Sequence, residues 1–179
     1  MVLRSAGAAP LVVGSLLGLG GGGRPLDLGV QDYGSGQKSL GLCPPVPSCV
    51  STAEDPADRE HYVPPWNYNP ALGRGGVPGG AVSCEQAMRE LEAAVLECRE
   101  GGYTPRIVKR RADYLRAEFK SRWLGAVDDV EFWFPPGTGS RVEYRSAARA
   151  GGDDRGAGRR RVRALRRALE ERGWRSEKL

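Results

Sequence analysis

Three carboxylates lie close together in this chain, at Asp128, Asp129 and Glu131. Arg145 and Arg149 follow in the next predicted strand or directly after it. Two carboxylates beside an arginine could bind a cation, or could combine a general base with an anion-binding group. The same residue types on neighbouring strands also form ion pairs, which stabilise a sheet by roughly 0.2–1 kcal/mol each. These five residues are the candidate site, and both interpretations are open from the sequence.

The alternation of side chains predicts which of these groups share a face. Successive strand residues point to opposite faces of a sheet, so Asp129 and Glu131 lie together, opposite the apolar residues of the stretch 127–134. Asp128 faces the other way. A carboxylate buried on that side must be hydrogen-bonded or paired, and an arginine is the expected partner.

The elements that must position these groups can be predicted from hydrophobic periodicity. A helix begins at Ser83, where Gln86 completes a capping box, and a second amphipathic helix runs from about Gly158 to Gly173. Between them, strand-like alternation occurs over the ranges 106–110, 114–122, 127–134 and 141–147. Short connections predict antiparallel neighbours. We therefore expect an α+β two-layer sandwich, with about four antiparallel strands and two helices on one face.

The N-terminal part of the chain has a different composition. The 179 residues include 26 glycines and 13 prolines, and most of their clusters precede residue 82. This predicts a long irregular arm over 25–80, followed by the α+β domain at 81–175. Residues 1–24 hold a short apolar stretch that cannot span a bilayer, which needs about 20 residues. We interpret 1–24 as a targeting segment or a disordered tail, and we expect a soluble protein with no transmembrane span.

Three aromatic residues of the arm, Tyr62, Trp66 and Tyr68, lie beside two prolines. One interpretation is an extended segment laid over the domain, and the other is a Pro-rich recognition segment for an external partner. Together with Trp133 on the charged sheet face, these rings form the candidate partner surface, because exposed aromatic side chains anchor contacts. For Trp133 the alternative is that the arm covers it.

The four cysteines allow several arrangements. Cys84 and Cys98 lie on one predicted helix, roughly 21 Å apart at 1.5 Å per residue, which is too far for a disulfide. Cys43 can pair with Cys49, each of these can pair with a helix cysteine, or the thiols are free and buried. The spacing does not match a zinc ribbon, and the single His61 completes no common zinc set. We expect no metal and no cofactor.

The C-terminal half is basic, with six arginines between positions 159 and 167. Nucleic-acid binding would use such residues, but no aromatic residue lies among them and no binding motif accompanies them. A solvated helix face is the favoured interpretation, and nucleic acid is an unlikely partner. The chain also lacks a phosphate-binding glycine loop and a nucleophile elbow. We therefore expect neither a P-loop nucleotide-binding enzyme nor an α/β-hydrolase.

Several short motifs occur in order along the chain: Leu42-Cys43-Pro44, Cys49-Val50-Ser51, His61-Tyr62, and the stretches 114–119, 127–132 and 144–147. From about residue 30 to residue 174 the sequence resembles the family called domain of unknown function 1499. Its form is similar to the plastid-associated branch of plants and algae. The resemblance implies a location in the chloroplast, with the thylakoid lumen as the finer alternative, and it brings no established activity.

These observations favour an uncharacterised soluble domain that is a non-catalytic binding or assembly-type protein. Its partner would be an unknown protein or small molecule, bound on the charged face of the sheet and the aromatic arm. The alternative is an enzyme that uses Asp128, Asp129 and Glu131 with Arg145 on an unknown substrate. Both depend on a sheet over 106–147 whose apolar face is covered by the helices and whose charged face is open.

Overall fold

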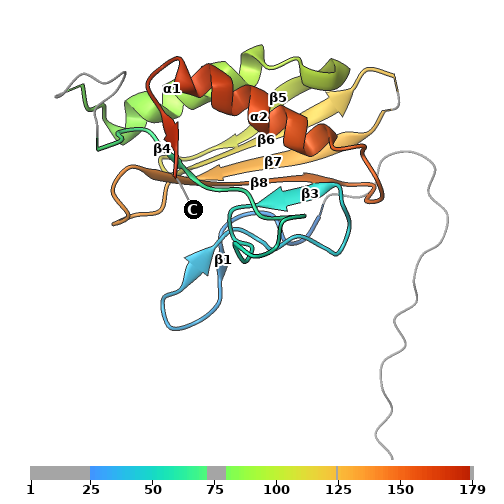
Figure 1. Ribbon diagram of the computed structural model, residues 1–179, viewed down its shortest axis with the longest axis horizontal. Coiled ribbons are helices and arrows are strands. Elements are labelled where there is room, and N and C mark those ends of the chain that lie inside the picture. The colour runs from blue at the N-terminus through green and yellow to red at the C-terminus, as the bar shows by residue number, and fades with distance from the viewer. Residues whose placement is uncertain (1–24, 72–79, 124, 178–179) are drawn as a thin grey trace, which may run out of the picture.

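The computed structural model of the chain describes residues 25–71, 80–123 and 125–177. The segment predicted to be a targeting or disordered region lies outside the described residues, as does most of the glycine-rich stretch before residue 80. The described part is a mixed α/β fold with a seven-stranded antiparallel sheet and two helices on one face of it (Figure 1). Neither helix in these ranges has the length and apolar character needed to cross a membrane.

The four long strands predicted from alternation are all present. They are β5 (Tyr103–Arg110), β6 (Tyr114–Ser121), β7 (Val127–Trp133) and β8 (Arg141–Ala148), paired in that order. β5 begins three residues earlier than the alternation indicated, because Tyr103 pairs with Ser121 and extends the ladder. The ladder between β5 and β6 shifts register between Ile107 and Lys109, and such a bulge bends an edge strand away from further pairing.

The prediction of about four strands was wrong, since three short strands complete the sheet. They are β3 (Cys49–Ser51), β4 (Trp66–Asn67) and β9 (Arg175–Ser176). β3 and β4 pair with successive parts of the outer edge of β8, and β9 pairs with β4. The N-terminal arm therefore supplies strands to the sheet, because the free edge of β8 offers unpaired backbone groups that need partners.

The main core lies between the sheet and the helices α1 (Cys84–Glu97) and α2 (Ala157–Glu170). Ser83 caps α1 as predicted: its hydroxyl accepts a hydrogen bond from the Gln86 amide at 3.1 Å. The apolar sheet residues Leu115, Phe132 and Val142 are fully buried beneath the helices. This confirms the predicted direction of the strands. Burying each such side chain contributes about 1.5–3 kcal/mol.

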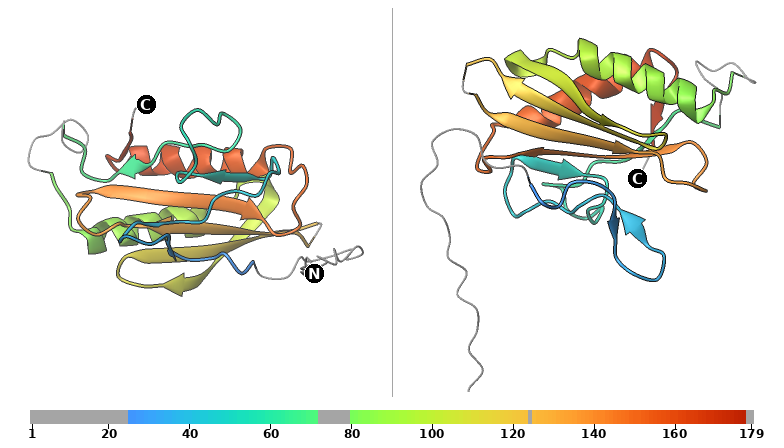
Figure 2. Two further views of the ribbon diagram at one scale, coloured as in Figure 1. Left: turned by 90° about the horizontal axis from the view of Figure 1, so that it is seen from below. Right: turned by 180° about the vertical axis from the view of Figure 1, so that it is seen from behind.

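The opposite face of the sheet is covered by residues of the arm. This part of the chain includes a small hairpin of β1 (Gln31–Asp32) and β2 (Lys38–Ser39), which projects away from the sheet (Figures 1 and 2). Leu40, directly after the hairpin, is fully buried against Tyr114 and Trp133. A second, smaller apolar cluster therefore fixes the arm on the face that we expected to be open.

Cys43 and Cys49 form a disulfide, one of the pairings that the sequence left open. Cys84 and Cys98 are free. The bond closes a loop of six residues directly before β3. Replacing both cysteines with serine is expected to lower the free energy of unfolding by about 2 kcal/mol, because the crosslink restricts the unfolded chain. Urea unfolding with and without reductant measures this. A stability that reductant leaves unchanged in the native chain contradicts it.

Candidate functional site

The candidate residues on the arm-covered face form a buried network of ion pairs. Asp129, 1 % exposed, accepts hydrogen bonds from Arg149 at 2.7 and 2.9 Å. A third bond to the same carboxylate comes from Arg116 at 3.2 Å. Glu118, next to Asp129 in the β6–β7 register, accepts from Arg106 and Arg149. Both oxygens of Asp129 are thus engaged by guanidinium groups.

Glu131 lies two residues further along β7 on the same face and is fully buried. Its Oε1 accepts from the Tyr114 hydroxyl and from the Gly29 amide, both at 2.6 Å. Its Oε2 accepts from Arg145 at 3.4 Å. Arg145 also donates to Asp27 at 2.8 Å. The two contacts from residues 27 and 29 join the arm to the middle of the sheet.

Asp128 lies on the helix side of the sheet, as the alternation predicted. It is 1 % exposed, and Arg161 of α2 donates to it at 2.6 Å. The Arg161 guanidinium lies between the rings of Tyr103 and Phe119, 4.7 and 4.6 Å from their centres. The expected arginine partner is therefore present. The sheet separates this pair from Asp129 and Glu131, so the four residues of the enzyme hypothesis do not meet in one site.

Burial sets the proton affinity of these groups. Burial raises the pKa of Glu131, and the hydrogen bonds from Tyr114, Gly29 and Arg145 oppose that shift. Burial likewise raises the pKa of Asp128, against the attraction of Arg161. The pKa of Arg149 is raised chiefly by its hydrogen bond to Asp129, which keeps the guanidinium charged. A general base needs a free oxygen near its substrate. Both oxygens of Asp129 and of Glu131 already accept hydrogen bonds, and Asp128 is paired with Arg161 in the core.

The arm is laid over the domain, which is the first of the two interpretations given for it, and three of the four candidate partner-surface aromatics are buried. Trp66 is 1 % exposed, and its ring stacks on Tyr144 with centres 4.2 Å apart. Tyr68 and Trp133 are also buried, at 7 % and 6 % exposed. For Trp133 the structure shows the second alternative, coverage by the arm, because Leu40 and Val30 pack against it. Tyr62 is half-buried. As folded, these rings mainly attach the arm to the sheet.

A cleft remains between the hairpin and the sheet. It has a volume of about 400 Å³ and reaches the edges of Tyr114 and Trp133. Three basic residues line it: Lys38 from the hairpin, and Lys109 and Arg111 at the end of β5. Within the described part of the chain, none of the three forms an ion pair with a carboxylate.

Two carboxylates also border this cleft, Asp32 and Asp113. Asp32 accepts a hydrogen bond from the Gly34 amide at 2.9 Å and so stabilises the hairpin turn. A second cleft of about 650 Å³ lies beside the first and shares Lys38, Trp133 and Pro136 with it. There Arg141 is already paired with Glu143 and Glu177. In the described residues the first cleft therefore holds three basic groups without carboxylate partners, and the Nζ of one of them, Lys109, lies 5.7 Å from the centre of the Tyr114 ring.

His61, the single histidine of the chain, lies in the arm. Its Nδ1 is 2.9 Å from Asp58 and its Nε2 is 3.2 Å from the carbonyl oxygen of Val46. The hydrogen bond to Asp58 raises the pKa of His61. These contacts join two loops of the arm, and no serine or cysteine nucleophile is among its hydrogen-bond partners in the described residues.

A raised histidine pKa makes stability depend on pH. The protonated form is favoured by the fold, so its contribution is fully present below the ordinary pKa of about 6.5. It is lost as the pH rises through the higher pKa of the folded chain. We expect the free energy of unfolding to fall over this interval in the native protein and to stay flat in His61→Gln. Urea unfolding across the interval measures the difference, and parallel curves for the two proteins would contradict it.

Several functional residues were not identified from the sequence. Arg116 alternates with Leu115 and Ala117 in the stretch 114–122, and its register opposite Glu131 could have marked it as a partner of the carboxylates. Arg161 lies four residues before Leu165 on the buried stripe of α2, which is the spacing of one helix face. Nothing local marked Lys38 or Gly29, because the residues that give them a role are more than 70 positions away: Lys109 lines the same cleft as Lys38, and Glu131 accepts the hydrogen bond of Gly29.

Comparison with known proteins gives one family match. The model of the family described as Protein of unknown function (DUF1499) matches residues 39–169. The matched range extends from β2 to the end of α2, and it includes the disulfide, all four long strands and both helices. No curated protein matches the chain, and no solved structure matches it.

Proposed function

The chain belongs to this family of proteins of unknown function, and we propose that it is a non-catalytic binding protein whose ligand occupies the cleft beside the β1–β2 hairpin. The observation that supports the proposal is the composition of that cleft. Lys38, Lys109 and Arg111 line the same cleft as the two buried rings of Tyr114 and Trp133, without carboxylate partners among the described residues. The cleft volume of about 400 Å³ is within the range of small-molecule sites, which hold apolar surface and a few polar groups.

The charge of the cleft indicates the kind of ligand. Three basic groups outnumber the two carboxylates, and Asp32 is engaged by the hairpin turn. A small ligand with a negatively charged group would reach the lysines and the arginine, and an apolar part would lie on Tyr114 and Trp133. Arginine and lysine donate charge-assisted hydrogen bonds to carboxylates and phosphates.

The buried network supports binding rather than catalysis at the charged face. Asp129 and Glu131 lie beneath the arm, and arginines, Tyr114 and Gly29 occupy their oxygens. Substrate access would require the arm to leave the sheet, and Leu40, fully buried, would then be exposed. Through its contacts with Asp27 and Gly29, the network fixes the arm that carries the hairpin and the cleft.

Titration of the full chain by NMR tests this proposal. We expect phosphate monoesters or small carboxylates from a screening panel to shift the amide signals of residues 29–38 and the indole signal of Trp133. Lys38→Gln and Arg111→Gln should each weaken binding by about tenfold, which corresponds to the loss of a charge-assisted hydrogen bond. The matched control is Arg89→Gln, an exposed arginine on α1. Shifts that are absent, or equal in all the variants, refute the proposal.

The proposal includes a location in the chloroplast, with the thylakoid lumen as the finer alternative. The similarity to the plastid-associated form of the family supports it. The Cys43–Cys49 disulfide is consistent with it, because disulfides persist in oxidising compartments. Immunoblotting of fractionated source cells, with protease protection of the thylakoids, tests the location. Recovery in the cytosol with both thiols open to alkylation would refute it.

A further inference from the structure

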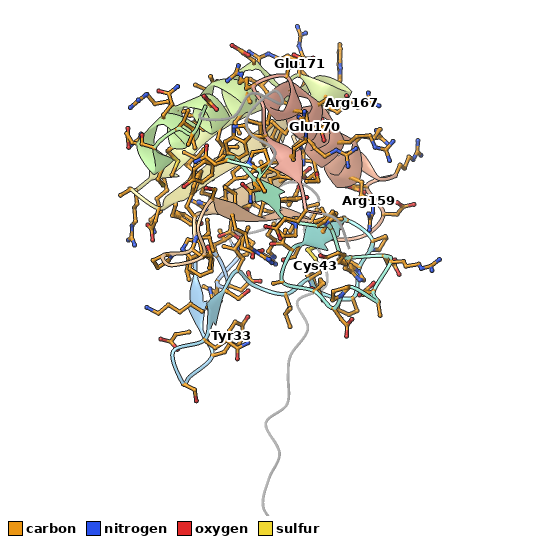
Figure 3. The ribbon with its side chains drawn as sticks, turned by 60° about the vertical axis from the view of Figure 1, so that its left-hand side comes forward. Tyr33, Cys43, Arg159, Arg167, Glu170 and Glu171 are labelled. Carbon is orange, nitrogen blue, oxygen red and sulfur yellow. A yellow bond between two sulfur atoms is a disulfide. The ribbon has the colours of Figure 1, made fainter. Side chains whose placement is uncertain are left out.

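The two clefts beside the hairpin form one continuous groove. The first has a volume of about 400 Å³ and the second of about 650 Å³, and Lys38, Trp133 and Pro136 line both of them. The hairpin supplies one wall of the groove, and Figure 3 shows it standing away from the sheet, with Tyr33 in its loop. A ligand that occupied only the first cleft would therefore use the smaller part of the groove.

The two ends of the groove differ in the pairing of their charged groups. The two lysines and the arginine of the first cleft have no carboxylate partner among the described residues. The second cleft also holds an arginine, Arg141, but its guanidinium is paired with Glu143 at 2.5 Å and with Glu177 at 2.9 Å. One arginine and two glutamates leave a net negative charge at this end. An anionic group of a ligand therefore fits the first cleft and is repelled from the second.

Other hydrogen-bonding groups of the second cleft are used within the fold. The Thr138 hydroxyl donates to the carbonyl oxygen of Pro135 at 2.8 Å. The backbone of Gln37 is engaged in the hairpin turn, where its amide and its carbonyl oxygen each form a hydrogen bond of 2.9 Å. Pro135 and Pro136 have no backbone N–H to donate. The second cleft therefore offers a ligand chiefly the apolar surface of these prolines and of the Trp133 edge.

We propose that the ligand of the groove is an elongated amphiphile with one anionic group and an apolar chain. This inference rests on the proposed function and extends it, because it identifies the class of ligand. The anionic group lies among the basic residues of the first cleft. The chain passes over Trp133 and Pro136, which both clefts share, and lies in the second cleft. A free medium-chain fatty acid is the simplest molecule with this chemistry.

The engaged polar groups favour an acyl chain over an extended peptide that ends in a carboxylate. A peptide brings an N–H or a C=O group at almost every position, and each of these needs a partner when it leaves water. The second cleft has few such partners to give, because Arg141, Thr138 and the Gln37 backbone are already bonded within the fold. An acyl chain needs none.

Titration of the full chain with butanoate, hexanoate and octanoate tests the proposal. Complete burial of one methylene raises affinity about fourfold, and an open groove buries only part of it, so we expect roughly twofold per methylene. Octanoate should therefore bind about 16-fold more tightly than butanoate. In NMR spectra octanoate should shift the amides of Thr138 and Glu143, which line the second cleft and not the first, whereas butanoate should leave them unchanged.

A dicarboxylate of the same length tests the difference between the two ends. Octanedioate has a second carboxylate, which would meet Arg141 already paired with two glutamates, so it should bind about tenfold more weakly than octanoate. Glu177→Gln should reduce this difference, because Arg141 then has one carboxylate partner. The matched control is Glu97→Gln, an exposed glutamate on α1 that is paired with Arg172. Octan-1-ol, which has the chain without the charge, should also bind about tenfold more weakly than octanoate.

The outcomes separate this inference from the proposed function. If butanoate shifts the signals of the first cleft and the longer acids bind no better, the proposed function stands and the inferred class of ligand is wrong. Equal binding of octanoate and octanedioate, or tighter binding of tetra-alanine than of octanoate, would also overturn the inference. If neither these acids nor the phosphate monoesters bind, both proposals fail. Circular dichroism verifies that each variant is folded.

Discussion

Arg161→Met is expected to lower the free energy of unfolding by about 3–5 kcal/mol, which is the usual cost of removing one partner from a buried ion pair. Arg161 is 1 % exposed, and its loss leaves the buried carboxyl of Asp128 without its partner between the sheet and α2. The rings of Tyr103 and Phe119 would also lose the guanidinium that lies between them. Urea unfolding followed by circular dichroism measures the change.

The double variant Asp128→Leu/Arg161→Met gives the decisive comparison. Apolar residues of similar volume often replace a buried pair with little loss, so most of the stability should return. Arg163→Met is the matched control, because this arginine is exposed two residues further along the same helix and should change stability by no more than about 0.5 kcal/mol. Equal effects of the two single replacements would show that the Arg161 pair contributes nothing specific.

Glu131→Ala is expected to cost a similar amount, about 3–5 kcal/mol, and also to release the arm. The replacement removes the acceptor of Tyr114 and Gly29 and the buried partner of Arg145. The amide of Gly29 should then exchange its hydrogen with solvent much faster, because the hydrogen bond that protects it is lost. Native-state hydrogen exchange together with urea unfolding measures both effects.

Two further variants identify the cause. Glu131→Gln keeps an oxygen for Tyr114 and Gly29, so it should protect the Gly29 amide better than alanine does. Asp27→Asn is the matched control, because Asp27 contacts the same arginine but is about half exposed, and exposed pairs contribute about 0–1 kcal/mol. If Glu131→Ala destabilises the protein while Gly29 keeps its protection, the carboxylate does not hold the arm.

The sequence was sufficient for the strands in which the alternation of apolar and polar residues continues over seven or eight positions. β6, β7 and β8 each span seven or eight residues, so alternation predicted both their existence and the direction of Asp128, Asp129 and Glu131. The strands β3, β4 and β9 have only two or three residues, which is too short for any period. β3 and β4 form on the free edge of β8, and β9 forms on β4, so all three depend on the assembled sheet.

The coverage of the charged face could not be predicted for a related reason. The contact between Gly29 and Glu131 joins residues 102 positions apart, and no local pattern in a glycine- and proline-rich arm indicates which face it will cover. Alternation identified the acidic and basic residues of this face, but it did not show that they would form ion pairs with one another. The basic cleft followed from the same long-range contacts, since Lys38 meets Lys109 and Arg111 only after the arm is in place.

The pairing of β3 and β4 with β8 also has a consequence for synthesis of the chain. Cys49–Ser51 and Trp66–Asn67 emerge from the ribosome long before Arg141–Ala148, and β9 follows later still. Until nearly the whole polypeptide has been made, Trp66 and Leu40 have no apolar surface to join, and such exposed segments are prone to aggregate. Cys43 and Cys49 are only six positions apart, so in an oxidising compartment their bond can close before the strands of the sheet have assembled.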